Sequence, residues 1–282
     1  MHTRALVNGD PTSRVEVWDR GFQYGDGVFT TLRVRSGIPL FLDHHLARLE
    51  RDCRRLALPF PNTPGLIREV RSLCEIWPEG VLKVLLTRGG GGRGYRCPDR
   101  VQGTRVLSMH PVPDYPPTIY EHGVEVRFCH TRLGINPSLA GIKHLNRLEQ
   151  VLARAEWSGT DIHEGLMLDV EGWVVEGTMT NLFLVLGETL HTPLLDRCGV
   201  AGVMRSLVLK AAAELGLPSQ ERRLRPEDLE AAEELFLTNS VIGIWPVRRL
   251  AAKTYRIGPV TREISRWVAK KIQEESVARY GA

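Results

Sequence analysis

The chain has 282 residues, which suits one large domain or two smaller ones. Apolar residues make up 43% of the chain and charged residues 25%, so a disordered, collagen-like or coiled-coil protein is excluded. No stretch of about 18 residues is free of charge, and the N-terminal residues lack the apolar core of a secretory signal. We therefore expect a cytoplasmic protein without a membrane partner.

The charged residues and cysteines narrow the classes of partner. The formal net charge is +4, and 31 of the 37 basic residues are arginines, which bind anionic small molecules but also nucleic acid. The arginines alternate with acids, as in residues 50–55, and no aromatic-rich or basic tract accompanies them, so we expect no nucleic-acid partner. The five widely spaced cysteines, without a CxxC pair, indicate reduced thiols and no metal site.

The first part of the chain alternates β-rich and amphipathic helical patterns. Asp43 is placed to cap the first helix, whose apolar residues recur at helical spacing until Pro59 ends it. The same spacing predicts a second helix over residues 64–77. The strands predicted in this part cover residues 28–34, 81–87 and 106–109.

A run of prolines over residues 111–117 predicts a stiff, extended linker. We therefore expect a small N-terminal α/β domain over residues 1–112, a proline-rich linker over 113–118 and a larger C-terminal α/β domain over 119–282. The predicted fold class is α+β in two domains.

The second part of the chain predicts three helices and several hairpin strands. A helix over residues 146–158 would turn its apolar side chains inward, a second would begin at Gly202 and close at Gly216, and a third would run from Pro259 to about Val277. The inward side chains would be Leu148, Val151, Leu152 and Ala155. The predicted strands cover residues 124–130, 166–169, 173–176, 182–186, 189–191 and 235–238.

The glycine run at residues 89–94 matches the GxGxxG pattern and follows a predicted strand. A dinucleotide fingerprint needs a helix directly after the glycines, and Pro98 opposes one, so we reject that interpretation. Two interpretations stay open for the loop that bears Arg88 and Arg93. It is either a mobile surface hairpin or a loop that binds a carboxylate.

Three further segments carry candidate chemistry. Lys143 has small or apolar neighbours, and a desolvated lysine amine can attack a carbonyl to form a Schiff base, although a lysine is more often a solvated surface group. The glycines at 199 and 202 lead into a helix whose first N–H groups either bind a phosphate or form an ordinary helix start. Glu176 is either a strand-edge residue or a partner for a heterocyclic nitrogen.

Together these segments resemble the fold-type IV pyridoxal-phosphate enzymes, the superfamily of D-amino-acid and branched-chain aminotransferases. Within that superfamily they are most similar to the bacterial aminodeoxychorismate lyases. The most specific segment spans residues 136–150, around Lys143. The supporting segments are residues 19–31, 88–95, 176–183 and 199–205. The resemblance extends from about residue 7 to residue 247, nearly the whole chain.

The resemblance implies that pyridoxal 5'-phosphate (PLP) is the cofactor and binds between the two domains. Lys143 would hold its aldehyde covalently, and Glu176 would pair with its ring nitrogen. The phosphate would lie against Arg48, Ser240 and the backbone of Val203 and Met204.

The resemblance also implies a lyase reaction that converts 4-amino-4-deoxychorismate to 4-aminobenzoate and pyruvate, a step toward folate. Lys143 would act as the general base, and Thr31 would assist proton transfer or contact the substrate. The substrate-binding candidates are Tyr24, Arg88, Arg93 and Tyr95, with either arginine as the main carboxylate contact. Because the family builds this pocket from two subunits, we expect a homodimer. The alternative is a D-amino-acid or branched-chain aminotransferase on the same scaffold.

Overall fold

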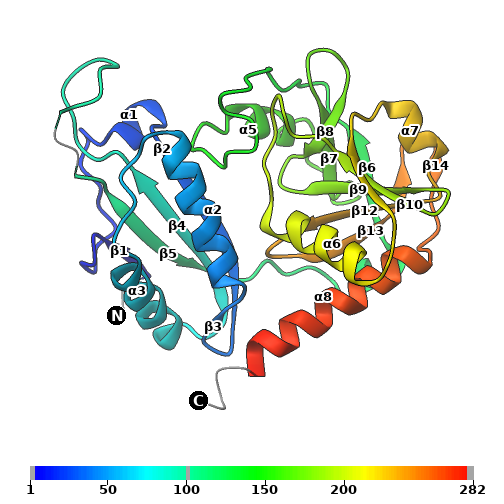
Figure 1. Cartoon of the computed structure of the whole chain (residues 1–282), viewed down its shortest axis with the longest axis horizontal. Helices are drawn as coiled ribbons and strands as arrows, with labels where there is room; N and C mark the ends of the chain where they lie inside the picture. Colours follow the sequence, from blue (N-terminus) through cyan, green and yellow to red (C-terminus); the bar gives the residue numbers. More distant parts are fainter. Residues whose placement is uncertain (1–3, 100–101, 278–282) are drawn as a thin grey trace. The chain divides into compact units, whose positions relative to one another are not determined.

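The computed structural model describes residues 4–99 and 102–277, so the outermost residues of both predicted domains lie outside the described part. The chain divides into two compact units, which we describe separately (Figure 1). Unit 1 comprises Met1–Pro113, Lys143–Asn146 and Ile272–Ala282, and unit 2 comprises Asp114–Ile142 and Arg147–Lys271. The mixture of helices and strands in each unit confirms the predicted α+β class.

Unit 1 is built on a five-stranded antiparallel sheet in the order β1-β5-β4-β2-β3. Its strands are β1 (Ala5–Val7), β2 (Gly27–Arg35), β3 (Ile38–Pro39), β4 (Gly80–Thr87) and β5 (Arg105–His110). Its helices are α1 (Arg20–Tyr24), α2 (Leu42–Arg55) and α3 (Thr63–Ile76), of which α2 packs against β2 (Figure 1). These elements contain the three strands and two helices that the sequence predicts here.

The start of α2 differs from the prediction. The helix begins at Leu42, and Phe41 precedes it in the left-handed region with a φ of 55°. Asp43 therefore lies in the first turn, where its negative charge interacts favourably with the helix dipole. The prediction that Asp43 caps the helix is wrong because buried Leu40 and Phe41 set the entry of the chain into the helix.

Unit 2 is built on a nine-stranded sheet in the order β11-β10-β9-β12-β13-β6-β7-β8, with β14 beside β13. Its strands are β6 (Val124–Phe128), β7 (Glu164–Leu168), β8 (Val174–Gly177), β9 (Asn181–Leu186), β10 (Thr189–Pro193), β11 (Ser219–Arg222), β12 (Glu234–Asn239), β13 (Gly243–Leu250) and β14 (Lys253–Thr254). Its helices are α4 (Thr118–His122), α5 (Leu148–Arg154), α6 (Val203–Glu214), α7 (Pro226–Ala231) and α8 (Pro259–Val277), the last belonging to this unit as far as Lys271. The hairpins β7–β8 and β9–β10 and the helices α6 and α8 confirm their predictions.

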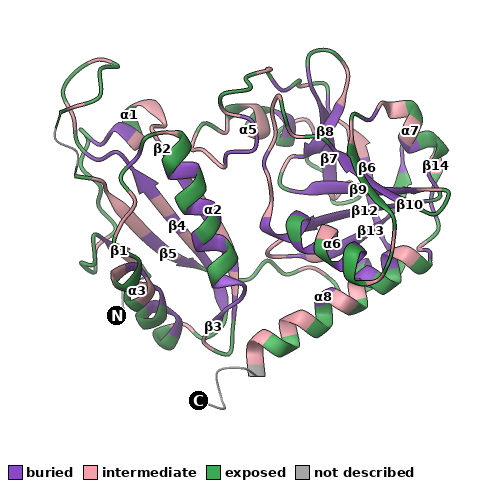
Figure 2. Cartoon of the chain, in the orientation of Figure 1, coloured by how far each residue is buried: buried purple, intermediate pink, exposed green. Residues whose placement is uncertain are grey.

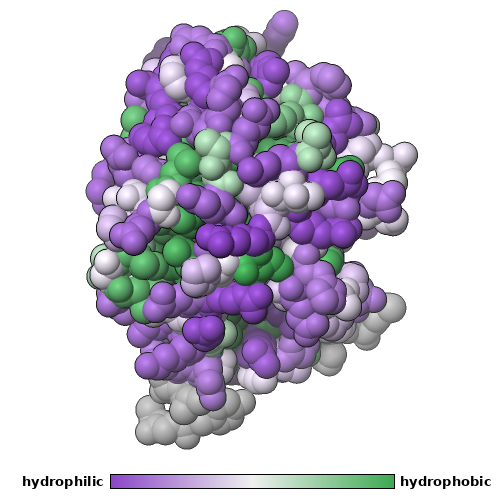
Figure 3. Space-filling model, turned by 90° about the vertical axis from the view of Figure 1, so that its right-hand side faces the viewer, coloured by the Kyte–Doolittle hydropathy of each residue, from purple (hydrophilic) through white to green (hydrophobic). Residues whose placement is uncertain are grey.

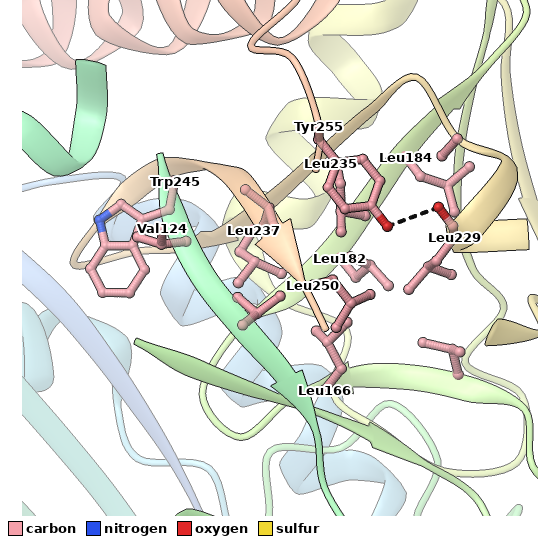
Figure 4. Close-up of a cluster of buried hydrophobic side chains, with 14 of the residues drawn as sticks. Val124, Leu166, Leu182, Leu184, Leu229, Leu235, Leu237, Trp245, Leu250 and Tyr255 are labelled. Atoms are coloured by element: carbon pink, nitrogen blue, oxygen red, sulfur yellow. Dashed lines mark hydrogen bonds between the residues drawn. The ribbon is translucent and has the colours of Figure 1, made fainter. Parts of the chain in front are cut away.

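An apolar core fills the space between this sheet and its covering segments (Figure 4). The core combines leucines of β9 and β12 with Trp245 of β13, and the Tyr255 hydroxyl donates a hydrogen bond of 2.9 Å to the carbonyl of Leu229. β13 is not among the strands expected from the sequence, and its Pro246 has no N–H to donate to a neighbouring strand. The strand nevertheless forms, with Pro246 opposite Phe236 of β12.

Helix α5 is shorter and more exposed than the sequence predicts. It spans Leu148–Arg154 instead of residues 146–158, and Ala153 is its one buried residue. The predicted inward side chains are exposed, with exposed fractions of 76% for Leu148, 60% for Val151 and 61% for Leu152. Ala155 is also exposed. The inward prediction is wrong because helical spacing identifies an apolar stripe but not the surface that covers it.

Buried residues concentrate on the strands of both sheets, and exposed residues on the outer helix faces and loops (Figure 2). The surface in Figure 3 is mainly hydrophilic, with apolar side chains interspersed. Within residues 4–99 and 102–277, no helix is both long and apolar enough to cross a membrane.

Candidate functional site

Lys143 is held in unit 1 by both of its peptide groups. Its N–H donates to Oδ2 of Asp52 on α2 at 3.1 Å, and its carbonyl accepts from the N–H of Phe29 on β2 at 2.9 Å. The side chain is half-buried, with Nζ 4.5 Å from the centroid of the Phe29 ring. The main chain of Lys143 is therefore fixed against α2 and β2, and its amine lies over an aromatic ring.

A buried polar cluster lies between the same two elements. Thr30 Oγ1 accepts from Arg48 Nη2 and contacts His45 Nδ1, both at 2.6 Å. Because Arg48 can only donate, the Thr30 oxygen is its acceptor, and the same hydroxyl links Arg48 to the imidazole of His45. Burial, and then the charge of Arg48, lower the pKa of His45 well below 6.5, so the ring is neutral.

Arg48 is a buried cation whose charge is incompletely balanced. It is 7% exposed, and burial lowers the pKa of its guanidinium to about 10 although Asp52 opposes the change. Among the described residues, neither Nε of Arg48 nor Nε2 of His45 has a hydrogen-bond partner. An anion bound beside Arg48 would supply the missing negative charge, so this cluster fits a phosphate group.

Glu176 has a comparably defined environment in unit 2. It lies on β8 and is 4% exposed, and its Oε2 accepts the N–H of Val200 at 2.8 Å. The nearby Arg147 has a pKa lowered by burial, and the negative charge of Glu176 counteracts that effect. Glu176 is therefore a buried carboxylate beside the glycine-rich segment that leads into α6.

The start of α6 brings Val203 and Met204 together as its first two residues, both buried. Gly202 precedes them, and a Cβ at this position would lie 2.1 Å from Oδ1 of Asn181, so the close approach requires glycine. The first N–H groups of a helix have no acceptor within the helix and carry a partial positive charge. The backbone here can therefore bind an anion. Ser240 is half-buried in the turn after β12.

The two adjacent threonines of β2 face opposite sides of the strand. Thr30 is buried against α2, whereas Thr31 is half-buried on the face that also carries Phe29. The sequence points to Thr31 as a site residue, whereas Thr30 and Asp52 become candidates only in the structure. Strand alternation, and the spacing of His45, Arg48 and Asp52 on one face of a helix, are the signals that could have found them.

The two loop arginines differ in their surroundings. Arg88 is 6% exposed, and its three guanidinium nitrogens donate to the Asp26 carboxylate and to the carbonyls of Leu56 and Ala57. Arg93 is exposed on the loop. Arg88 is thus occupied by protein groups, whereas Arg93 projects toward solvent.

Tyr24 and Arg20 support the same loop from α1. The Tyr24 ring packs edge-on to Tyr95 at 5.5 Å between centroids, and its hydroxyl accepts the N–H of Gly94. Arg20 Nη1 donates to the carbonyl of Gly94 at 2.9 Å. None of residues 89–99 lies in a helix, which confirms the rejection of a dinucleotide fingerprint.

The predicted site residues thus fall into two groups. Unit 1 holds Tyr24, Thr31, Arg48, Arg88, Arg93, Tyr95 and Lys143, and unit 2 holds Glu176, Val203, Met204 and Ser240. The first group contains Lys143, whose main chain is fixed, and Arg48, a buried cation whose charge is incompletely balanced. The second combines a buried carboxylate with a helix start.

Comparison with known proteins gives matches over almost the whole chain. Residues 27–250 match the model of the amino-transferase class IV family. The chain is 39% identical to an aminodeoxychorismate lyase of Vibrio harveyi, covering 92% of this chain and 97% of that protein. It is 49% identical to the 4-amino-4-deoxychorismate lyase crystal structure from Pseudomonas aeruginosa, with a TM-score of 0.91 and coverage of 94% and 98%.

A more distant solved structure has the same fold. It is a hypothetical aminotransferase from Mycobacterium tuberculosis in a PLP-bound form, 21% identical, with a TM-score of 0.82 and coverage of 96% of this chain and 99% of that one. The likeness confirms the fold-type IV prediction. The chain belongs to the amino-transferase class IV family.

Proposed function

We propose that this protein is a PLP-dependent lyase that converts 4-amino-4-deoxychorismate to 4-aminobenzoate and pyruvate, a step toward folate. The names of the two lyase relatives support this reaction, and both matches cover more than nine-tenths of the chain. The observation that carries the proposal is the placement of Lys143. Both of its peptide groups are fixed on α2 and β2, the elements that also surround Arg48, a buried cation whose charge is incompletely balanced.

The residues that would hold the coenzyme are those that the resemblance identifies. Lys143 would bind its aldehyde carbon, and Glu176 would hold a proton at its ring nitrogen. The phosphate would be bound by Arg48, by the N–H groups of Val203 and Met204, and by the Ser240 hydroxyl. When bound, PLP supplies an electron-accepting ring that stabilises negative charge on the carbon bearing the substrate amine.

Lys143 also provides the base that the reaction needs. As a free amine, Lys143 would remove the proton from the amine-bearing carbon of the substrate. Cleavage of the bond between the substrate ring and the enolpyruvyl oxygen would then release enolpyruvate and make the ring aromatic, which drives the reaction forward. The released enolpyruvate would take up a proton on carbon to become pyruvate. The Glu176 carboxylate is held in place for its contact with the ring nitrogen, because its Oε2 already accepts the N–H of Val200.

The loop of residues 89–99 would bind the substrate, which carries two carboxylates. Arg93 is the better candidate for the main contact, because the nitrogens of Arg88 already bind Asp26 and two carbonyls. Tyr24 and Tyr95 would line the same region. Thr31 would assist proton transfer or contact the substrate from the face of β2 that carries Phe29.

We further propose a cytoplasmic homodimer. The exposed apolar side chains of α5 suit an interface between two copies of the chain. No disulfide is present in the part of the chain that the structure describes, which suits a reducing compartment.

The coenzyme assignment is tested by absorption spectroscopy of the purified protein. We expect a near-ultraviolet to blue coenzyme band that borohydride removes, with the reduced coenzyme attached to Lys143 in a peptide map. Lys143→Ala should lack both the band and the label. Lys83→Ala is the matched control, because Lys83 Nζ also lies over Phe29, at 5.0 Å, and its loss should change neither. A label on another residue would overturn the assignment.

The reaction is tested by product analysis with 4-amino-4-deoxychorismate. We expect 4-aminobenzoate and pyruvate in equal amounts. The alternative, a D-amino-acid or branched-chain aminotransferase, shares the cofactor and lysine. Rapid amino transfer from D-alanine or a branched-chain amino acid to 2-oxoglutarate, without production of 4-aminobenzoate, would replace the lyase with that alternative.

A further inference from the structure

Asp52 is a fully buried carboxylate to which the proposed reaction gives no role. It lies on α2 and its side chain is 0% exposed. Oδ1 accepts from Nε and Nη2 of Arg51, at 3.0 and 2.7 Å, and Oδ2 accepts the peptide N–H of Lys143 at 3.1 Å. Each oxygen therefore has a different partner, one a side chain and one the backbone of the candidate catalytic lysine.

The contact with Lys143 joins two segments that are far apart in the sequence. Asp52 and Lys143 are separated by 91 positions. On its other side the Lys143 peptide accepts from Phe29, and the next residues continue along β2, with Leu145 N–H donating to the Gly27 carbonyl. These contacts hold the C-terminal side of Lys143 on β2, and the contact with Asp52 holds its N–H on α2, so Asp52 ties this segment to the helix.

Burying a carboxylate is costly unless its lone pairs are satisfied. Arg51 offsets the charge of Asp52, but the Arg51 side chain is 45% exposed and approaches from the solvent side. The opposite oxygen faces Lys143, and the carboxylate lies one helical turn from Arg48, where its negative charge counteracts the effect of burial on the pKa of that guanidinium. The negative charge of Asp52 therefore lies beside both the Lys143 peptide and Arg48.

We propose that Asp52 is a positioning residue that orients the Lys143 peptide, and through it the lysine amine, for attack and proton transfer. The inference rests on the proposed function, because Lys143 is the reactive amine only in that function. Asp52 itself is not among the residues proposed to bind the coenzyme. Without Asp52, the buried Lys143 N–H loses its acceptor and the amine samples more orientations. The chemical step should slow more than substrate binding weakens, because orientation matters most in the transition state.

Two substitutions separate the acceptor from the charge. Asp52→Ala removes both. Asp52→Asn keeps the size and one acceptor oxygen, which can face Lys143, but its amide nitrogen cannot accept from Arg51. Glu69→Ala is the matched control: Glu69 binds Arg105 Nη2 in unit 1 at 2.5 Å and is partly buried, so its loss destabilises the unit without touching Lys143.

The first measurement is hydrogen exchange of the Lys143 amide in the purified protein. We expect Asp52→Ala to accelerate exchange at this amide by at least tenfold, Asp52→Asn to accelerate it less, and Glu69→Ala to leave it unchanged. Unchanged exchange in both Asp52 variants would overturn the inference. If Asp52→Ala does not fold, Asp52→Leu, which also lacks an acceptor, replaces it with the same expected result, and unchanged exchange in that variant would overturn the inference.

The second measurement separates positioning from general stability. For Asp52→Ala we expect kcat to fall by at least tenfold while KM changes less than threefold, with partial recovery in Asp52→Asn. In Glu69→Ala, kcat should stay at the wild-type value. Faster exchange with unchanged kcat would refute the positioning role. A wild-type protein in which borohydride labels no lysine would instead refute the proposed function, so the two failures are distinguishable.

Discussion

At the scale of single residues, the site depends on which face of a strand each side chain occupies. Thr30 and Thr31 are neighbours in sequence, yet Thr30 contacts His45 and Arg48 and Thr31 faces the other side of β2. The Thr30 hydroxyl accepts from Arg48 and also contacts Nδ1 of His45. It therefore fixes the orientation of the arginine that would bind the coenzyme phosphate.

Replacing Thr30 by valine should weaken coenzyme binding. The change keeps the side-chain shape but removes the acceptor of a buried guanidinium, and a hydrogen bond to a charged group contributes about 1.5–3 kcal/mol. We expect the dissociation constant for PLP to rise about 10-fold to 150-fold, as measured by fluorescence titration of the coenzyme-free protein. His45→Gln should also weaken binding, and an unchanged constant in Thr30→Val would contradict the orienting role.

Thr31→Ala addresses the other threonine. If its hydroxyl takes part in proton transfer or substrate contact, the variant should bind PLP normally, because it does not touch Arg48, yet turn over more slowly. Steady-state assays of 4-aminobenzoate formation give the answer. Wild-type turnover with intact coenzyme would remove Thr31 from the proposed site.

Asp26 should make unit 1 sensitive to acid. Burial opposes its ionisation, but hydrogen bonds and charges of Arg88 and Arg20 outweigh burial and lower the pKa of the carboxyl below 3.8. A lowered pKa stabilises the folded state above the unfolded-state pKa, and this contribution disappears as the pH falls through the folded-state value. Asp26→Asn should lower the free energy of unfolding by about 2–4 kcal/mol at pH 7.

Urea unfolding at several pH values tests the Asp26 prediction. The difference between Asp26→Asn and wild type should shrink as the pH falls below about 4. Asp99→Asn is the control, because Asp99 and its partner Arg96 are almost fully exposed, at 87% and 86%, and should contribute little. A difference that stays constant with pH would show that the ionised carboxyl is not the source.

At the scale of elements, the turn between β8 and β9 is held by one buried carboxylate. Glu164 of β7 is 0% exposed and accepts hydrogen bonds from the N–H groups of Gly165, Thr178 and Met179 and from the hydroxyls of Thr178 and Thr180. Burial raises the pKa of this carboxyl although these bonds oppose the change. The turn lies between Glu176 and Asn181, so its conformation determines where both side chains point.

Removing this carboxylate should affect both stability and the site. Glu164→Ala leaves several buried donors without an acceptor, and each such donor costs about 1–3 kcal/mol, so we expect a loss of at least about 3 kcal/mol. Glu164→Gln keeps one acceptor oxygen and should lose less. Thermal unfolding measures the first effect and PLP titration the second; wild-type stability in Glu164→Ala would contradict the role of the turn.

At the scale of the whole molecule, the exposed face of α5 determines the expected assembly. Leu152→Glu would place a charge among the apolar side chains that we assign to a subunit interface. Light scattering should then report a monomer where the wild-type protein is a dimer. Ile76→Glu is the control, because Ile76 is also an exposed apolar side chain, at 46%, and lies at the end of α3 in unit 1. A wild-type monomer, or a dimeric Leu152→Glu variant, would contradict this interface.

Local patterns predicted much of the fold. Alternating apolar residues identified β2, β4 and β5, glycine placed the end of α6, and Pro259 placed the start of α8. These patterns can be detected locally because a strand or helix buries one face. The apolar residues of that face recur at the period of the element, so the sequence of the element alone identifies it. Lys143 and Glu176 could be selected for the same reason: a motif of neighbouring residues marks them.

The remaining features needed the tertiary structure, because they depend on contacts between residues far apart in the chain. Spacing could not show that the apolar side chains of α5 are exposed, that Arg88 is occupied by Asp26, or that Asp52 holds the Lys143 peptide. The sequence by itself determined the family, the fold class and the candidate residues. Only folding decided their partners, because burial and hydrogen bonding are properties of the packed chain.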